Sequence, residues 1–255
     1  RVAEVAAANV TRVHQELGGK SANIILDDAP DFAKAVSGGI IGCFGNSGQS
    51  CNAPTRMLVP KARLAEAMEI ATAAAAKASV GDPSDENTRL GPVVSELQFN
   101  KITALIEKGI EEGAELLLGG PGRPVGFDKG YYIRPTVFGN VTNDMTIARE
   151  EIFGPVISVT TFKDEAEALA IANDTEFGLG AGVWTRDMNL AYRMGRNIQA
   201  GRVWTNCYHA YPAHAAFGGY KKSGIGRETH KKALEHYQQT KNLLVSYSTS
   251  PLGFF

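Results

Sequence analysis

Residues 45–56 read Gly45-Asn46-Ser47-Gly48-Gln49-Ser50-Cys51-Asn52-Ala53-Pro54-Thr55-Arg56. This segment contains a cysteine among small and amide side chains, directly after residues with the composition of a helix. Upstream, residues 15–21 read Gln15-Glu16-Leu17-Gly18-Gly19-Lys20-Ser21 and supply a carboxylate. A thiol can attack a carbonyl carbon and a carboxylate can move protons, so Cys51 and Glu16 together indicate covalent catalysis.

Both motifs resemble those of the aldehyde dehydrogenase family. The resemblance implies that Cys51 is the nucleophile and that Glu16 is the general base. It extends in order over nearly all of the 255 residues. Its strongest C-terminal match reads Phe217-Gly218-Gly219-Tyr220-Lys221-Lys222-Ser223-Gly224-Ile225-Gly226-Arg227-Glu228. Residues 207–216, which precede this match, would form part of the aldehyde entrance.

The implied chemistry makes demands on both side chains. The thiolate adds to the aldehyde to give a thiohemiacetal, oxidation leaves a thioester, and water releases the acid. Since a free thiol has a pKa of about 8.5, the site must favour the thiolate or a base must take the proton. We expect Glu16 to activate the hydrolytic water and, as a second role, to deprotonate Cys51; partial burial that raises its pKa would help. The backbone N–H of Cys51 is one candidate oxyanion donor.

A second group of residues is implied to meet a nicotinamide cofactor. Residues 151–156 read Glu151-Ile152-Phe153-Gly154-Pro155-Val156. By resemblance, Glu151 accepts hydrogen bonds from the nicotinamide ribose hydroxyls and Phe153 packs beside the ring. Gln98 and Lys101, on a helix that follows Gly91-Pro92-Val93-Val94-Ser95, are expected near the cofactor ribose. The expected cofactor is NAD or NADP, with NAD favoured, and the expected substrate is a small-molecule aldehyde.

The other reactive side chains receive structural interpretations. Free cysteines are commonly buried, and Cys43 and Cys207, which lack a motif, are interpreted as structural thiols. His209 and His214 have no cysteine or carboxylate partner at a suitable spacing, so no metal site is predicted.

Composition excludes several classes of protein. Hydrophobic residues make up 44% and charged residues 21%, and the net charge is −1. These values are typical of a globular domain and give no basic surface for nucleic acid or for an anionic membrane. No apolar run reaches the roughly 18–20 residues of a membrane span, and no signal peptide is recognised. Three cysteines without framework spacing favour a reducing compartment, so the expected localisation is cytoplasmic.

Apolar runs and helix-period segments alternate along the chain. Short apolar runs predict strands at 24–26, 56–59, 115–118, 132–138, 156–162, 181–185 and 201–206. Helical patterns predict helices from after Asp31 to about 45, and at 61–79, 95–112, 164–173, 187–198 and 226–238, with helical composition at 1–14. This alternation predicts an α/β fold, a largely parallel three-layer sheet flanked by helices and similar to an aldehyde dehydrogenase catalytic domain.

Three divisions of the chain follow from the resemblance. Residues 1–17 are interpreted as the remnant of a cofactor-binding domain that would precede residue 1, residues 18–240 as the catalytic domain, and residues 241–255 as a C-terminal oligomerisation arm. The arm contains a predicted strand at 242–247, which would pair with another subunit of a homo-oligomer, a dimer or tetramer. The alternative is a strand that folds back on its own sheet.

Three functions remain open at this level. The first is oxidation of an aldehyde to a carboxylic acid with NAD(P)+, by what looks like the catalytic half of the enzyme. The second is a cofactor-independent thiol esterase that uses the same Cys51 thioester. The third is an inactive assembly fragment that lacks the cofactor domain.

Overall fold

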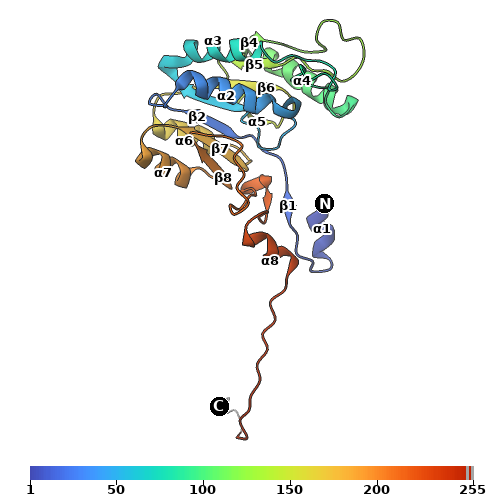
Figure 1. Cartoon of the computed structure of the whole chain (residues 1–255), viewed down its shortest axis with the longest axis vertical. Coiled ribbons are helices and arrows are strands. Elements are labelled where there is room, and N and C mark those ends of the chain that lie inside the picture. Colours follow the sequence, from blue (N-terminus) through green and yellow to red (C-terminus); the bar gives the residue numbers. More distant parts are fainter. Residues whose placement is uncertain (251–252, 254–255) are drawn as a thin grey trace.

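A central sheet of seven strands organises the chain (Figure 1). The computed structural model describes residues 1–250 and 253. Across the sheet the strands follow in the order β4 (Glu115–Leu118), β5 (Thr136–Gly139), β6 (Val156–Phe162), β3 (Arg56–Pro60), β2 (Ala22–Ile25), β7 (Gly180–Trp184), β8 (Arg202–Thr205). Only the edge strand β4 is antiparallel to its neighbour, and the other neighbouring strands are parallel. The predicted α/β fold with a largely parallel sheet is confirmed.

Helices cover both faces of this sheet. One face carries α2 (Phe32–Phe44) and α3 (Leu64–Ala75); the other carries α4 (Glu96–Glu111), the short α5 (Thr146–Arg149), α6 (Glu165–Asn173) and α7 (Met188–Asn197). Four of these helices begin at a side chain that accepts a backbone N–H of the first turn, namely Asp31, Ser95, Asp164 and Asp187. Such caps satisfy donors that the helix itself cannot pair, so they fix where each helix begins.

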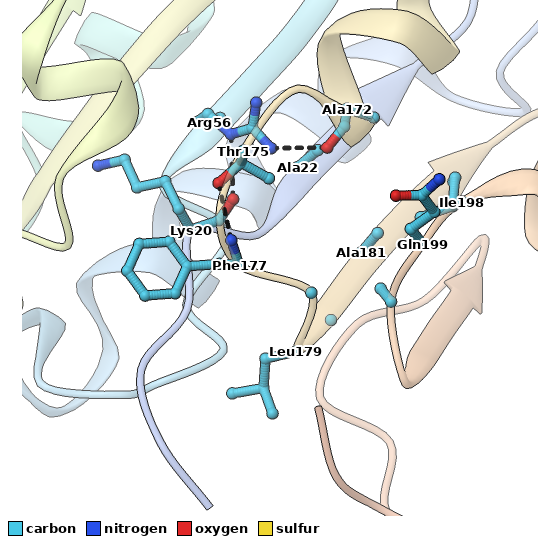
Figure 2. Close-up of a pocket in the computed structure, with 13 residues that line it drawn as sticks. Lys20, Ala22, Arg56, Ala172, Thr175, Phe177, Leu179, Ala181, Ile198 and Gln199 are labelled. Atoms are coloured by element: carbon cyan, nitrogen blue, oxygen red, sulfur yellow. Dashed lines mark hydrogen bonds between the residues drawn. The ribbon is translucent and has the colours of Figure 1, made fainter. Parts of the chain in front are cut away.

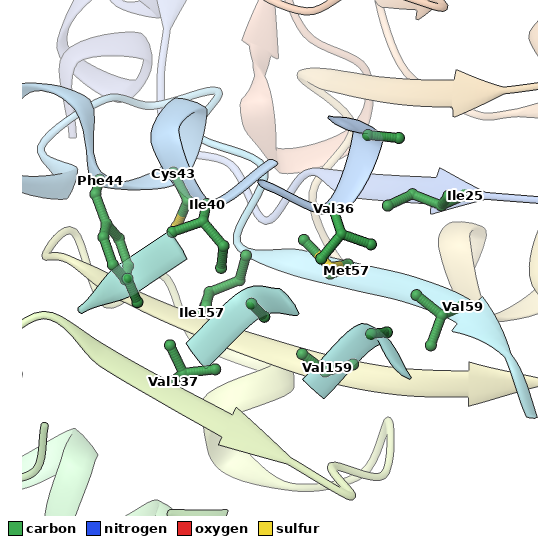
Figure 3. Close-up of a cluster of buried hydrophobic side chains, with 14 of the residues drawn as sticks. Ile25, Val36, Ile40, Cys43, Phe44, Met57, Val59, Val137, Ile157 and Val159 are labelled. Atoms are coloured by element: carbon green, nitrogen blue, oxygen red, sulfur yellow. The ribbon is translucent and has the colours of Figure 1, made fainter. Parts of the chain in front are cut away.

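The core follows the two-residue period of the central strands. Ile25, Met57 and Val59 belong to the cluster formed with α2 and α3 (Figure 3). Ile24 and Leu58, their neighbours in sequence, belong to the cluster that includes residues of α6 and α7. Side chains on a strand alternate between faces, so a continuous apolar run is what a strand covered by helices on both sides requires.

A two-stranded ribbon stands apart from the main sheet. Its strands are β1 (Gln15–Glu16) and β9 (Gly224–Ile225), which pair antiparallel. Gly224 has φ +142°, and a Cβ at this position would lie 2.1 Å from the carbonyl oxygen of Gln15. Only glycine therefore permits this approach. The ribbon brings the N-terminal motif and the C-terminal motif together.

The remaining elements are short. They are α1 (Val2–Ala7), α8 (Leu234–Tyr237) and four 3₁₀ turns at Gly45–Gly48, Lys61–Arg63, Lys221–Ser223 and Lys231–Ala233. The predicted helix at 226–238 is therefore wrong over its first half, where Gly226, Thr229 and His230 all have positive φ values that break a helix. The predicted helix at 61–79 begins as a 3₁₀ turn and ends as a helix at Ala75. The strand predicted at 132–138 begins only at Thr136, because Pro135 has no N–H to donate.

The C-terminal segment extends away from the body of the molecule (Figure 1). Among the described residues, 242–247 pair with no strand, and the side chains of Leu243 and Leu244 are more than 80% exposed. The alternative of a strand folded back on its own sheet is therefore wrong. Residues 251–252 and 254–255 of the predicted arm lie outside the described residues. Across the part of the chain that was searched, no helix has the length and apolar character needed to cross a bilayer.

Candidate active site

Three predicted site residues lie just before three neighbouring strands. Glu16 precedes β2, Cys51 precedes β3 and Glu151 precedes β6, and the sheet order places β6, β3 and β2 side by side. Because these strands are parallel, their amino ends meet at one edge of the sheet. The topology thus brings together three side chains that are far apart in the sequence.

Two glycines allow this convergence to be close. A Cβ at Gly19 would lie 2.3 Å from the carbonyl oxygen of Cys51, and a Cβ at Gly18 would lie 2.3 Å from Oε2 of Glu151. The backbone N–H of Gly19 donates to Oε1 of Glu151 at 2.8 Å. The Gly18-Gly19 pair therefore lets the segment after Glu16 pass directly against both other site segments.

The Cys51 thiol is held in its protonated form. Burial raises the pKa of this thiol to about 11, and the charge of Glu16 and a hydrogen bond with its carboxylate add to the effect. A thiol with this pKa is almost wholly protonated at neutral pH. Of the two routes expected from the sequence, a site that favours the thiolate and a base that takes the proton, this geometry favours the second.

Glu16 has the properties of that base. Burial raises the pKa of its carboxyl above the usual range; Glu228 and Glu151 also raise it, whereas the bond from Cys51 and nearby His14 lower it. A raised pKa makes a carboxylate a stronger base, as expected. Its Oε1 is buried and has no hydrogen-bond partner within the described residues, so it is free to bind a proton.

The turn that carries Cys51 is tightly constrained. Asn46 and Ser47 both adopt positive φ values, near 54°. The hydroxyl of Ser47 donates to the carbonyl oxygen of Gly91 at 2.8 Å, and Oε1 of Gln49 accepts from the N–H of Val94 at 2.9 Å. The family-like segment 91–95 is therefore a brace for this turn.

The predicted cofactor residues form a second cluster at the same edge. Phe153 is half-buried and has φ +60°. Gln98 Nε2 donates to the carbonyl oxygens of Ile152 and Phe153 at 3.0 and 2.9 Å, and Lys101 Nζ donates to that of Glu151 at 2.7 Å. Gln98 and Lys101 thus hold the strained turn that presents Glu151 and Phe153.

A loop after β8, residues 206–217, contacts the turn that carries Cys51 (residues 45–52), and several of these contacts were not anticipated from the sequence. The hydroxyl of Tyr208 donates to the carbonyl oxygen of Asn52 at 3.0 Å, and Nδ2 of Asn52 donates to the hydroxyl of Tyr211. Buried Arg202 donates to the carbonyl oxygens of residues 210, 215 and 216 and so fixes the shape of the loop. The aromatic residues that recur between positions 204 and 217 are the sequence signal from which this packing could have been predicted.

The other cysteines and histidines differ from one another. Cys43 is fully buried, as predicted, but Cys207 is exposed, so its interpretation as a buried structural thiol is wrong. Cys207 lies on the loop after β8, and connecting loops run over the surface of a protein. His209 is half-buried and His214 is exposed. Among residues 1–250 and 253, no group of three or more potential ligands is arranged around a metal ion.

A cavity near the site is too small for a substrate and lies among residues that hold the fold together. It is lined by residues that include Lys20, Arg56, Phe177 and Leu179, and its volume is about 10 Å³ (Figure 2). This is room for about one water molecule. Arg56 is buried and donates to the carbonyl oxygens of Lys20, Ile171 and Ala172, so it ties the start of β2 to the end of α6.

Comparison with known proteins decides the family. The model of the aldehyde dehydrogenase family matches residues 1–243. The chain belongs to the aldehyde dehydrogenase family.

The relatives of this aldehyde dehydrogenase chain are similar over all of its length. It is 54% identical to an acetaldehyde dehydrogenase of Pseudomonas aeruginosa, over 100% of the chain and 51% of that protein. It matches the structure of a mutant aldehyde dehydrogenase C of Pseudomonas syringae in complex with NAD+ and octanal, with a TM-score of 0.93 and 50% identity. The match covers 98% of this chain and 51% of that one. An NAD+ complex of an aldehyde dehydrogenase from Bacillus cereus matches with a TM-score of 0.93 and 40% identity, covering 97% of this chain and 50% of that one. The chain thus spans about half the length of these aldehyde dehydrogenases.

Proposed function

We propose that this chain supplies the catalytic region of an NAD-dependent aldehyde dehydrogenase that oxidises an aldehyde to a carboxylic acid. The observation that carries the proposal is the pairing of a half-buried thiol of raised pKa at Cys51 with a carboxyl of raised pKa at Glu16. The same proposal takes residues 18–240 as the catalytic domain, residues 1–17, which contribute Glu16 to the site, as the remnant of a cofactor-binding domain, and residues 241–255 as an arm for homo-oligomeric assembly.

In this proposal proton transfer accompanies the attack of the thiol. The Cys51 S–H donates to the Glu16 carboxylate, and as Sγ attacks the aldehyde carbon the proton passes to Glu16. The resulting thiohemiacetal oxygen is stabilised by the backbone N–H of Cys51. After oxidation a thioester remains on Sγ. Glu16, once it has lost its proton to solvent, takes a proton from water. The hydroxide adds to the thioester carbon, the bond to Sγ breaks, and Glu16 returns the proton to Sγ as the acid is released.

The residues present fit a nicotinamide cofactor. When bound, NAD+ supplies the acceptor for the hydride that the oxidation releases. Glu151 uses Oε1 for the Gly19 N–H, which leaves acceptor capacity on Oε2 for the hydroxyls of a ribose. Gln98 and Lys101 would act by holding the Glu151–Phe153 turn in place. We favour NAD over NADP because the similar structures named above contain NAD+.

A thiol esterase remains a second candidate, because the Cys51–Glu16 pair lies wholly within this chain. Such an enzyme would cleave activated esters through the same thioester without a cofactor.

The test is nicotinamide reduction, followed at 340 nm, with a panel of aliphatic and aromatic aldehydes and with NAD+ or NADP+. The matched control is the Cys51→Ala variant. Turnover with an aldehyde and NAD+ that disappears in this variant supports the proposal. Ester cleavage without cofactor, also lost in Cys51→Ala, together with no aldehyde turnover by the full-length protein, would replace the dehydrogenase by the esterase.

A further inference from the structure

Asn52, the residue after the nucleophile, is buried in a network that the proposed mechanism does not use. Asn52 is only 2% exposed. The hydroxyl of Ser50 donates to its Oδ1 at 3.1 Å, and its Nδ2 donates to the hydroxyl of Tyr211. Its carbonyl oxygen accepts from the hydroxyl of Tyr208 at 3.0 Å. Both the side chain and the backbone of Asn52 are therefore held by hydroxyl groups.

The backbone N–H of Asn52 acts on the thiol directly. It belongs to the residue directly after Cys51, and its interaction with the thiol lowers the pKa of that thiol. Burial, the hydrogen bond with Glu16 and the charges of Glu16 and Glu151 all act in the opposite direction. Among the contacts resolved in the described part of the chain, Asn52 thus supplies the stabilisation of the thiolate.

The two tyrosines belong to a different part of the fold from Asn52. Both lie on the loop after β8, and their rings pack against Trp204, with centroids 4.5 and 5.8 Å away. The guanidinium of Arg202 lies 5.3 Å from the ring of Tyr211 and fixes the loop backbone. This loop therefore determines where the two hydroxyls, and with them Asn52, are placed.

We infer that Asn52 is a positioning residue for the Cys51 thiol, and that Tyr208 and Tyr211 of the loop at 206–217 act on the nucleophile through it. The inference rests on the proposed function only in taking Cys51 as the nucleophile. It makes the loop a determinant of thiol reactivity in addition to any contact with an aldehyde.

The test measures alkylation of Cys51 by iodoacetamide between pH 7 and 11, in a Cys207→Ser background that removes the exposed thiol. The modified Cys51 peptide is quantified by mass spectrometry. Tyr208→Phe and Tyr211→Phe retain the rings, and so the burial, but lose the hydroxyls. We expect each to slow alkylation at pH 8 by about threefold to tenfold, the range of one ordinary hydrogen bond, and to move the midpoint of the pH profile upward. The matched control is Tyr192→Phe, an exposed tyrosine on α7 that should not change the profile.

A double-mutant cycle separates positioning from a direct effect. If Tyr211 acts through Asn52, then Tyr211→Phe has no further effect in an Asn52→Ala background. Equal slowing in both backgrounds, or unchanged profiles in folded Tyr208→Phe and Tyr211→Phe proteins, overturns the inference. Circular dichroism establishes that each variant is folded. Alkylation needs neither aldehyde nor cofactor, so these outcomes are independent of whether the protein oxidises aldehydes.

Discussion

The turn that carries Cys51 and the strand that carries Glu16 are built in opposite ways. The nucleophile turn, residues 45–52, is braced by bonds from Ser47 to Gly91 and from Val94 to Gln49, and it lies against the core of the sheet. Glu16, the proposed base, lies on β1, a two-residue strand outside the main sheet, with Leu17 beside it 46% exposed. The thiol is thus positioned by the core, whereas the base is positioned by one ribbon. The difference teaches that a substitution in the ribbon can change the position of Glu16 relative to Cys51 without disturbing the fold.

The largest effect should come from the base itself. Glu16→Gln removes the proton acceptor, so we expect kcat/KM of the aldehyde reaction to fall about 10²–10⁴-fold, the usual worth of a general base. Only the deprotonated carboxylate is active and its pKa is raised, so wild-type activity should fall as the pH drops through a value above 4.5. The variant should lack this acidic limb. Steady-state rates from pH 5 to pH 9 measure both effects, with exposed Glu69→Gln as the control; a variant within threefold of wild type would exclude this role for Glu16.

The next effect should fall on stability, at the nucleophile turn. Gly48 has φ +74°, and an added Cβ would lie 2.0 Å from the backbone of Gly154. We expect Gly48→Ala to lower the free energy of unfolding by about 2–4 kcal/mol, because strain and overlap add. Urea denaturation measures the change. Gly45→Ala, in the same turn with nothing within 4 Å of its Cβ, should cost less than about 1 kcal/mol; equal losses would show that the turn is not constrained as described.

A smaller effect separates activity from stability at the ribbon. Gly224→Ala would push β9 away from the carbonyl oxygen of Gln15 and so displace Glu16. We expect about a tenfold loss of kcat/KM but a loss of only about 1–2 kcal/mol in unfolding free energy, because β1 carries few core contacts. Turnover and urea denaturation are measured on the same preparation, with Gly195→Ala on α7 as control. A variant as destabilised as Gly48→Ala would remove the contrast between the two regions.

The smallest effect concerns the turn before β6. Lys101→Met removes the donor to the carbonyl oxygen of Glu151, and an ordinary hydrogen bond is worth about 1 kcal/mol. We therefore expect KM for NAD+ to rise about threefold to tenfold with kcat little changed. The control is Lys77→Met, an exposed lysine after α3. A change confined to kcat would contradict a role in presenting Glu151.

The sequence predicted the elements best where local signals suffice. The strands at 115–118 and 156–162 match the structure residue for residue, because short apolar runs flanked by turn residues specify a strand locally, whether it lies at the edge of the sheet or in its buried centre. The helix predicted at 226–238 failed because apolar spacing does not reveal the positive φ values of Gly226 and His230. Those values arise from tertiary contacts, such as the bridge between Phe217 and Glu228.

In the candidate site, too, the residues marked by a local motif were predicted and those that depend on distant contacts were not. Cys51, Glu16 and Glu151 were found from their motifs, and parallel pairing of the following strands explains why they meet. The contribution of Asn52 was not found, because it depends on hydroxyls that a distant loop places beside it. Likewise, no spacing in the sequence reveals that burial raises the pKa of Cys51 to about 11.

The pairing of β1 with β9 also has a consequence for the order of synthesis. Glu16 and Cys51 are made well before Gly224 and Ile225, which pair with the strand of Glu16. A growing chain can therefore fold the nucleophile turn while its base is still unsupported, and long-range pairings of this kind form late. The carboxyl that takes the proton of the thiol in the proposed mechanism is therefore held in place only after the C-terminal motif has been made and has folded against it.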